Sequence, residues 1–180
     1  MAINAFKTKT EYRADPFALP NSLNFTNFVL LIRNFKILDS FSNTFIIALS
    51  SVSISVVIGI FASYAFAKLR FKGRSFVYLS IIATMFIPAQ VTMIPMYYLM
   101  SQLHLTNKLI SVIITYVATS LPGTILLMTT NFSSISNEMI EAATIDGAGY
   151  FVIVRKIVVP MGMAVIAINI IFTFLAASND

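Results

Sequence analysis

The sequence has no cysteine and a single histidine, His104, in 180 residues. Without cysteine, a disulfide scaffold, a thiolate metal site and thiol catalysis are excluded. One histidine supports neither a histidine metal centre nor a Ser-His-Asp triad, and we expect His104 to be solvated in a short outer loop. The chain also lacks a Gly-x-x-x-x-Gly-Lys-Ser/Thr segment that could cradle phosphate. We therefore predict that this chain is not an enzyme, has no metal site and does not itself hydrolyse ATP.

Charged residues are also scarce: 11% of the chain is charged, whereas 58% is hydrophobic. Soluble domains are nearer a quarter charged, so this composition indicates a membrane protein. About 20 helical residues cross the apolar core of a bilayer. We therefore place membrane helices near 43–67, 76–99, 108–130 and 161–178. Because the apolar runs lack the strict alternation of membrane strands, the predicted fold is an all-α, polytopic transmembrane helix bundle.

The basic residues predict the orientation of the chain. The net charge is +5, but the basic residues lie in short groups between apolar runs. This pattern is typical of loops that face the cytoplasm and anionic lipid, so we expect no nucleic-acid partner. Segment 68–74 carries four basic and no acidic residues and is predicted to be cytoplasmic. Alternation then places 101–107 outside, 131–160 inside and the C-terminus outside, in a multi-pass membrane protein.

Residues 1–40 differ from the rest because they are polar and contain several prolines and asparagines. They are predicted to form an extracytoplasmic loop with one short helix around Phe25–Leu38, and residues 41–180 form the transmembrane domain. Nothing ahead of residues 1–40 could carry them across the membrane. We therefore expect that a helix is missing before residue 1 and that more is missing after residue 180.

The prolines and serines of the apolar runs each allow two interpretations. Pro88, Pro95 and Pro122 could be hinges for alternating access, or static kinks satisfied by neighbouring helices. The serines could permit close helix packing or line a pore, and the packing interpretation is favoured. They are Ser50, Ser51, Ser53 and Ser55.

Segment 131–160 carries the clearest functional signal. Ser136 is a good helix N-cap, and Glu138 follows in the first turn, where the helix dipole favours a carboxylate. A short helix is predicted from about 137 to 145, and Gly147 suits the left-handed position after it. Glu141 is expected to point away from the face that carries Ile140, Ala143 and Thr144. A second stretch, Tyr150–Val159, leads through Pro160 into the last helix.

Glu141-Ala142-Ala143-x-x-Asp146-Gly147-Ala148, followed twelve residues later by Pro160, resembles the EAA loop of binding-protein-dependent ABC importer permeases. Other segments resemble the maltose and multiple-sugar branch of this family, although Thr44 and Ser178 stand where serine and tryptophan are usual. The resemblance covers nearly the whole chain. Such permeases have about six helices, and this sequence resembles helices two to five, so about four spans are expected.

The resemblance implies a mechanism and a set of partners. The EAA loop would form a coupling helix in a cleft of a cytoplasmic ATPase dimer, where Glu141 meets a basic residue and Ala142 and Ala143 pack. Asp146, Gly147, Ala148 and Pro160 belong to the same docking motif. The remaining partners are a second permease subunit and an extracellular solute-binding protein. ATP and Mg would lie on the ATPase, with no cofactor on this chain.

The implied function is uptake of sugars or oligosaccharides. Gln90, Tyr97 and Tyr98 could face the solute, or the tyrosines could be ordinary interfacial residues. No span has an interior carboxylate or lysine, which argues against an ion-coupled carrier. Three alternatives stay open: a permease for another polar solute such as glycerol phosphate, a non-transporting truncated remnant, and a membrane scaffold or channel without an ATPase.

Overall fold

Helices form all of the regular secondary structure in the residues that the computed structural model describes, which are 2–15, 17–19, 22, 24–25, 28–29 and 37–178. This confirms the predicted all-α fold class. The chain divides into two units, Met1–Thr44 and Phe45–Asp180. We describe each unit by itself.

In the first unit, a 3-10 turn, η1 (Ala2–Phe6), precedes the short helix α1 (Lys9–Ala14). Thr8 and Glu11 form a capping box at the start of α1, in which each side chain accepts from the backbone N–H of the other residue. Neither element was predicted, because residues 1–40 were expected to be mainly loop. The predicted helix around Phe25–Leu38 lies for the most part outside the described residues.

Two long helices, α3 (Ile37–Lys68) and α6 (Leu109–Ser133), are each apolar and long enough to cross a membrane. They contain the predicted first and third spans. Two further spans are present if each of two bent helix pairs counts as one. The remaining elements of this part of the chain are α4 (Arg74–Ala83), η2 (Thr84–Phe86), α5 (Ala89–Gln102), α7 (Asn137–Ile145), α8 (Tyr150–Ile153), η3 (Val154–Val158), α9 (Val159–Met161) and α10 (Met163–Ser178).

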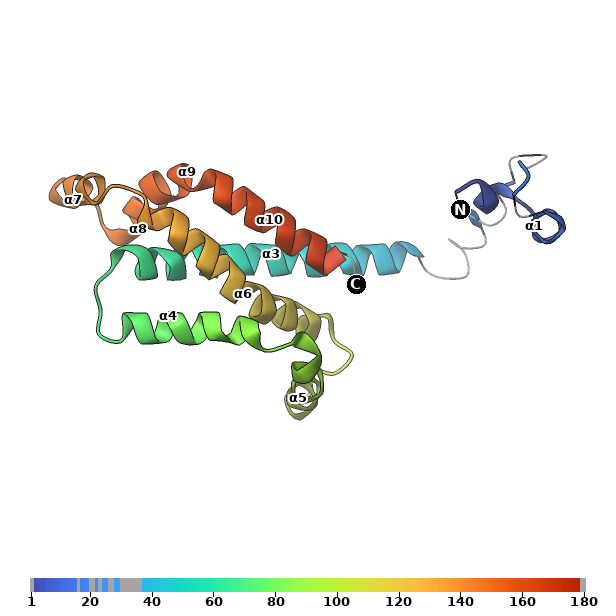
Figure 1. The fold of residues 1–180 in the computed structure, drawn as a ribbon, viewed down its shortest axis with the longest axis horizontal. Helices are drawn as coiled ribbons and strands as arrows, with labels where there is room; N and C mark the ends of the chain where they lie inside the picture. The colour runs from blue at the N-terminus through green and yellow to red at the C-terminus, as the bar shows by residue number, and fades with distance from the viewer. Residues whose placement is uncertain are drawn as a thin grey trace. The chain divides into compact units, whose positions relative to one another are not determined.

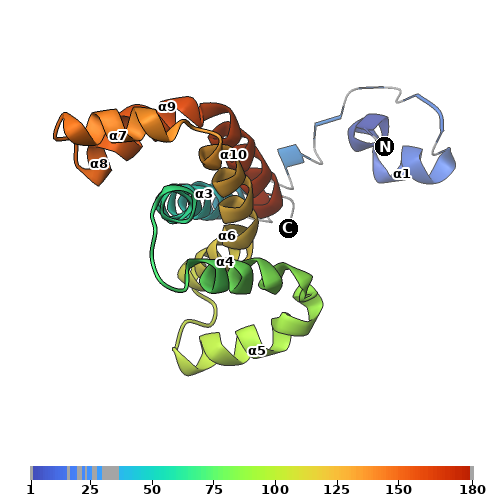
Figure 2. The same cartoon turned by 60° about the vertical axis from the view of Figure 1, so that its left-hand side comes forward.

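The second predicted span is broken, whereas one helix was predicted near 76–99. The helical segments on either side of the break, Arg74–Phe86 and α5, are bent by 105°, and Figure 2 shows α5 turning away after α4. Ile87 has extended dihedrals, with φ −85° and ψ 117°. Pro88 disfavours a helical conformation in the residue before it and cannot donate a helix hydrogen bond. Pro95 and Pro122, in contrast, lie within the continuous helices α5 and α6.

Helix α3 packs on α6 through a row of small side chains. Ser51, Ser55, Gly59 and Ser63 recur at intervals of four residues and are all buried. The Ser55 hydroxyl lies 2.8 Å from that of Ser120, and a methyl group at Gly59 would lie 2.4 Å from Thr124 Cγ2. Small residues allow membrane helices to approach this closely. The packing interpretation is thus confirmed for Ser55, and Ser51 is also buried, whereas Ser53 is exposed.

Candidate coupling site

The short helix α7 begins and ends close to where the sequence predicted. It spans Asn137–Ile145, against a predicted 137 to 145. The Ser136 hydroxyl accepts a hydrogen bond of 3.2 Å from the backbone N–H of Glu138, which confirms Ser136 as the N-cap. Glu138 places a carboxylate in the first turn, where it interacts favourably with the helix dipole.

The C-terminal turn of α7 is a Schellman motif. The N–H of Gly147 donates to the Thr144 carbonyl at 3.0 Å, and the N–H of Ala148 donates to the Ala143 carbonyl at 2.9 Å. Gly147 has φ +81°, the left-handed conformation that glycine adopts without a steric penalty. The chain can therefore reverse direction sharply between α7 and α8, as predicted.

One face of α7 attaches the helix to the rest of the bundle. Ile140 and Ala143 on this face, and Ala148 in the turn after the helix, are partly buried against a hydrophobic core cluster. The cluster consists of Tyr64, Met128, Phe132, Ile135, Ile153, Val154, Val158 and Ile166. Met128, Phe132 and Val158 are fully buried, so α7 rests on the best-packed part of the chain.

The opposite face of α7 is open to solvent. Its exposed side chains include Glu141, Ala142, Ile145 and Asp146, and we call these four residues the docking surface. Ile145 is 86% exposed, so nearly all of its apolar side chain is uncovered. Sequence reasoning did not single out Ile145. It grouped Ala142 with Ala143, but Ala142 is exposed and Ala143 contacts the core of its own chain.

Lys68, the last residue of α3, fastens the start of α7. Its Nζ atom donates to the Ser133 carbonyl at 3.3 Å, to Oδ1 of Asn137 at 2.9 Å and to the Ile135 carbonyl. These bonds hold the predicted cytoplasmic segments 68–74 and 131–160 at the same end of the bundle, which Figures 1 and 2 also show. Lys68 entered the sequence analysis only as a charge that sets orientation.

The chain leaves α7 through an irregular helix that contains Pro160. Helix α8 runs into a π-helical turn, η3, and Pro160 follows in the first turn of α9, where a missing N–H is tolerated. The segment Tyr150–Met161 is bent by 80° from α10, with Gly162 at the bend. A methyl group at Gly162 would lie 2.4 Å from Phe132 Cε1, so only glycine fits against this ring. Pro160 itself is exposed.

A second candidate region is a cavity of about 740 Å³ between α5 and the first half of α6, which we call the outer cavity. Gln90 and Tyr97 line it, whereas Tyr98 does not. Sequence reasoning missed the other polar lining residues, because their positions depend on the bend before α5. These residues include Asn107, Ser111, Thr115, Tyr116 and Thr119. Among the described residues, no group of three or more His, Cys, Asp or Glu could hold a metal ion.

Comparison with known proteins identifies the family. Residues 55–180, more than half of the chain, match the family described as "Binding-protein-dependent transport system inner membrane component". The diacetylchitobiose uptake system permease protein NgcG of Streptomyces coelicolor is 30% identical over 99% of this chain. The osmoprotective compounds uptake permease protein GgtD of Synechocystis is 32% identical over 86% of it. AmyC of Thermoanaerobacterium thermosulfurigenes, a probable starch degradation products transport system permease protein, is 28% identical over 88%.

The chain spans 59%, 52% and 58% of the lengths of these three relatives. The match to the family begins inside α3. It includes Lys68 and the residues that Lys68 contacts, as well as α7 and α10. Together with the apolar helices, the family assigns the chain to the bacterial cell membrane as a multi-pass protein. The chain belongs to the family of inner membrane components of binding-protein-dependent transport systems.

Proposed function

We propose that this chain forms part of the permease of an ATP-binding-cassette importer that takes up sugars or oligosaccharides. The observation that carries the proposal is the structure of α7. One face of this helix is fixed to the core through Ile140 and Ala143, while Glu141, Ala142 and Ile145 point outward on an otherwise rigid support. An ordinary solvated loop would need neither a capped helix nor a Schellman turn.

The proposed partner of the docking surface is a cytoplasmic ATPase dimer. Glu141 is exposed and free to meet a basic residue, and Ala142 leaves the helix thin enough to enter a cleft. Ile145, which is 86% exposed, adds apolar area at the C-terminal end of the same surface. ATP and Mg would be bound by the ATPase. A second permease subunit and an extracellular solute-binding protein complete the proposed assembly.

The connections of α7 suggest how ATPase movement would reach the membrane. The start of α7 is tied to the end of α3 by Lys68. Its end continues through the Schellman turn, α8 and η3 into α10. Packed helices move as rigid bodies rather than deform continuously. Displacement of α7 is therefore expected to move both α3 and α10. The bend at Gly162 is the point at which the angle between the segment Tyr150–Met161 and α10 can change.

The lining of the outer cavity is suited to a polyhydroxylated solute. Its lining combines the Gln90 amide with hydroxyls and the Tyr97 ring, groups that can hydrogen-bond sugar hydroxyls and cover a flat sugar face. NgcG and AmyC are named for uptake of sugar-derived compounds. A second candidate substrate class is other polar solutes, because GgtD is named for osmoprotective compounds.

The docking proposal is tested by co-purification of the ATPase subunit with the permease. The variant combines Glu141→Gln with Gly147→Ala. Its matched control combines Glu138→Gln with Gly149→Ala, which alters an exposed carboxylate of the same helix and a glycine with ordinary φ. An exposed ion pair contributes about 1 kcal/mol at most, so the Glu141 change alone should weaken binding about fivefold. Unchanged recovery of the ATPase by the first variant would rule out the coupling role.

Substrate class is tested separately, by uptake in cells that express the complete importer with its solute-binding protein. Labelled disaccharide and labelled glycerol phosphate are compared at equal concentration. Accumulation of the disaccharide alone supports the sugar assignment. Accumulation of glycerol phosphate alone would indicate that the substrate belongs to the other polar solutes. Uptake of neither compound by an assembly that hydrolyses ATP would contradict both substrate classes.

A further inference from the structure

The loop between α3 and α4, residues 68–74, carries basic groups that the chain itself does not neutralise. Lys68 is occupied by the carbonyls near α7, and Nη1 of Arg74 lies 3.4 Å from the Leu69 carbonyl oxygen. Within the described part of the chain, Arg70 and Lys72 have no hydrogen-bond or ion-pair partner. The loop contains no acidic residue. Its positive charge is therefore available to an external anion.

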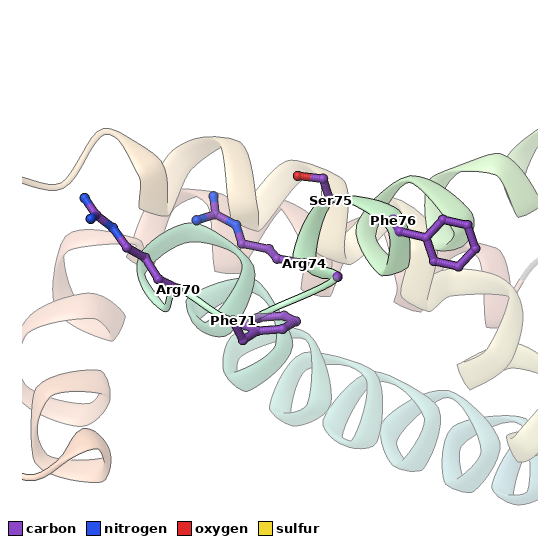
Figure 3. A pocket seen from close by; sticks show the side chains of 6 residues that line it. Arg70, Phe71, Arg74, Ser75 and Phe76 are labelled. Atoms are coloured by element: carbon purple, nitrogen blue, oxygen red, sulfur yellow. The ribbon is translucent and has the colours of Figure 1, made fainter.

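Part of this charge faces a cavity of about 540 Å³. The residues that line it are Arg70, Phe71, Gly73, Arg74, Ser75 and Phe76. In Figure 3 the side chains of Arg70 and Arg74 extend in the same direction, whereas the Phe76 ring points away from them along α4. Guanidinium groups and a hydroxyl offer several donors, and the planar fork of arginine matches phosphate oxygens. The polar side of the cavity therefore suits a phosphate group.

The other side of the cavity is apolar and continues along α4. Phe76 is 77% exposed, and Leu79, three residues later on the same face, is 63% exposed. Ala83 extends this face by a further turn and is also exposed. No residue of α4 is buried. A free soluble phosphate would gain nothing from this surface, whereas an acyl chain would be covered by it.

The loop is held in place beside this face by aromatic packing. The Phe71 ring lies 6.0 Å from Phe66, and Phe66 lies 5.4 Å from Tyr78 in α4. This chain of rings links the end of α3 to α4 across the loop. The backbone that carries the arginines is therefore held next to the start of the apolar face, so headgroup and acyl-chain contacts can be made by one molecule.

We propose that the cavity at residues 70–76 binds the phosphate headgroup of an anionic phospholipid, with an acyl chain along Phe76, Leu79 and Ala83. Charge complementarity selects an anionic lipid over a zwitterionic one, and the exposed apolar face selects a lipid over a soluble phosphate. The proposal depends on the membrane location of the chain and not on the transported solute.

The test uses fluorescence quenching by brominated lipid. Because the sequence contains no tryptophan, Phe76→Trp places a single indole reporter at the junction of cavity and apolar face. Phe172→Trp, at a position in α10 that is 65% exposed, reports the bulk lipid. Each chain is reconstituted in equimolar phosphatidylcholine and phosphatidylglycerol, with one or the other lipid brominated. We expect brominated phosphatidylglycerol to quench the Phe76→Trp variant preferentially, and both lipids to quench the Phe172→Trp variant equally.

The arginines are tested in the Phe76→Trp background. A cation near an anionic headgroup changes lipid affinity by about fivefold. Arg70→Gln should therefore lower the relative affinity for phosphatidylglycerol about fivefold, and adding Arg74→Gln should abolish the preference. Arg70 has no partner in the described residues, so its single replacement should not disturb folding. Arg155→Gln with Lys156→Gln removes the same number of charges from another exposed pair and should leave the preference intact.

Four results would overturn the proposal. The first is equal quenching of the Phe76→Trp variant by both lipids, and the second is a preference that survives in the double arginine variant. The third is loss of the preference when inorganic phosphate replaces chloride at constant ionic strength, which would assign the cavity to a soluble phosphate. The fourth is loss of quenching by both lipids when the second permease subunit is present, which would make this face a subunit interface.

Discussion

The Nζ atom of Lys68 lies 2.9 Å from Oδ1 of Asn137, so the last residue of one membrane helix touches the first residue of the short helix α7. The same ammonium group donates to the Ser133 and Ile135 carbonyls at the end of α6 and in the turn that follows. Helix C-termini leave carbonyl groups without intrahelical partners. Lys68 thus donates hydrogen bonds to carbonyl groups at the end of α6 and holds α7 at a defined angle to the bundle.

Replacing Lys68 by methionine should loosen α7 without unfolding the bundle. Methionine preserves the apolar stem but removes every donor to Ser133, Ile135 and Asn137. A hydrogen bond from a charged group contributes about 1.5 kcal/mol. We therefore expect amide hydrogen exchange in α7 to become about tenfold faster, as measured by mass spectrometry in detergent. Lys72→Met is the matched control, since Lys72 is exposed and has no hydrogen-bond partner among the described residues. Equal exchange in the two variants would contradict the role given to Lys68.

Gly147→Ala should lower stability, whereas Gly149→Ala should change it little. An added methyl group would meet no atom within 4 Å at either position, so sterics with neighbours do not distinguish them. Gly147 has φ +81°, where alanine costs about 1–2 kcal/mol. Gly149 has φ −74°, which alanine adopts without strain. The gain from restricting the unfolded chain is offset because Gly149 is the N-cap of α8, where glycine is preferred to alanine, so little net change is expected. Thermal unfolding in detergent should show a lower midpoint for the first variant only. Equal midpoints for the two variants would mean that the stability of the turn does not depend on the Gly147 conformation.

The elements that could be predicted from the sequence are those with local signals. Ser136 and Gly147 mark the two ends of α7 by cap chemistry that involves only their close neighbours in the sequence. Long apolar runs likewise predicted α3 and α6. The family resemblance of Glu141–Ala148 adds a function to this helix but not its orientation. Which alanine points outward became clear only from the packing of Ala143 on the core.

The features that could not be predicted depend on contacts between distant segments. Lys68 forms hydrogen bonds with partners 65 to 69 residues away in the sequence, and no local sequence pattern predicts such a contact. The three prolines show the same limit. Pro88 lies at the break between two helical segments, as the N-cap of α5, whereas Pro95 and Pro122 are tolerated inside helices. Neighbouring groups decide whether the freed carbonyls are satisfied, so the residue type alone does not locate the break.

Gly162→Ala should destabilise the bend before α10. The new methyl group would lie 2.4 Å from Phe132 Cε1 and 3.1 Å from the Val158 carbonyl oxygen, and Phe132 is fully buried. Overpacking of this kind costs about 1–3 kcal/mol. Gly123→Ala is the control, because its nearest neighbour, Met85 Cε, would be 3.9 Å away and alanine favours the helix. Chemical denaturation in detergent should therefore separate the two variants. Equal midpoints would show that the bend relaxes without cost.

Tyr97→Phe and Tyr98→Phe test whether the outer cavity contributes to the solute pathway. The two tyrosines are adjacent and similarly exposed, at 69% and 64%, but only Tyr97 lines the cavity. Loss of one hydrogen bond to a solute hydroxyl costs about 1 kcal/mol, so the Tyr97 variant should raise the KM for uptake about fivefold in the assembled importer. The Tyr98 variant should leave the KM unchanged. If both variants behave like the parent, the cavity does not bind solute through Tyr97. If Tyr98→Phe alone raises the KM, the solute passes the opposite side of α5.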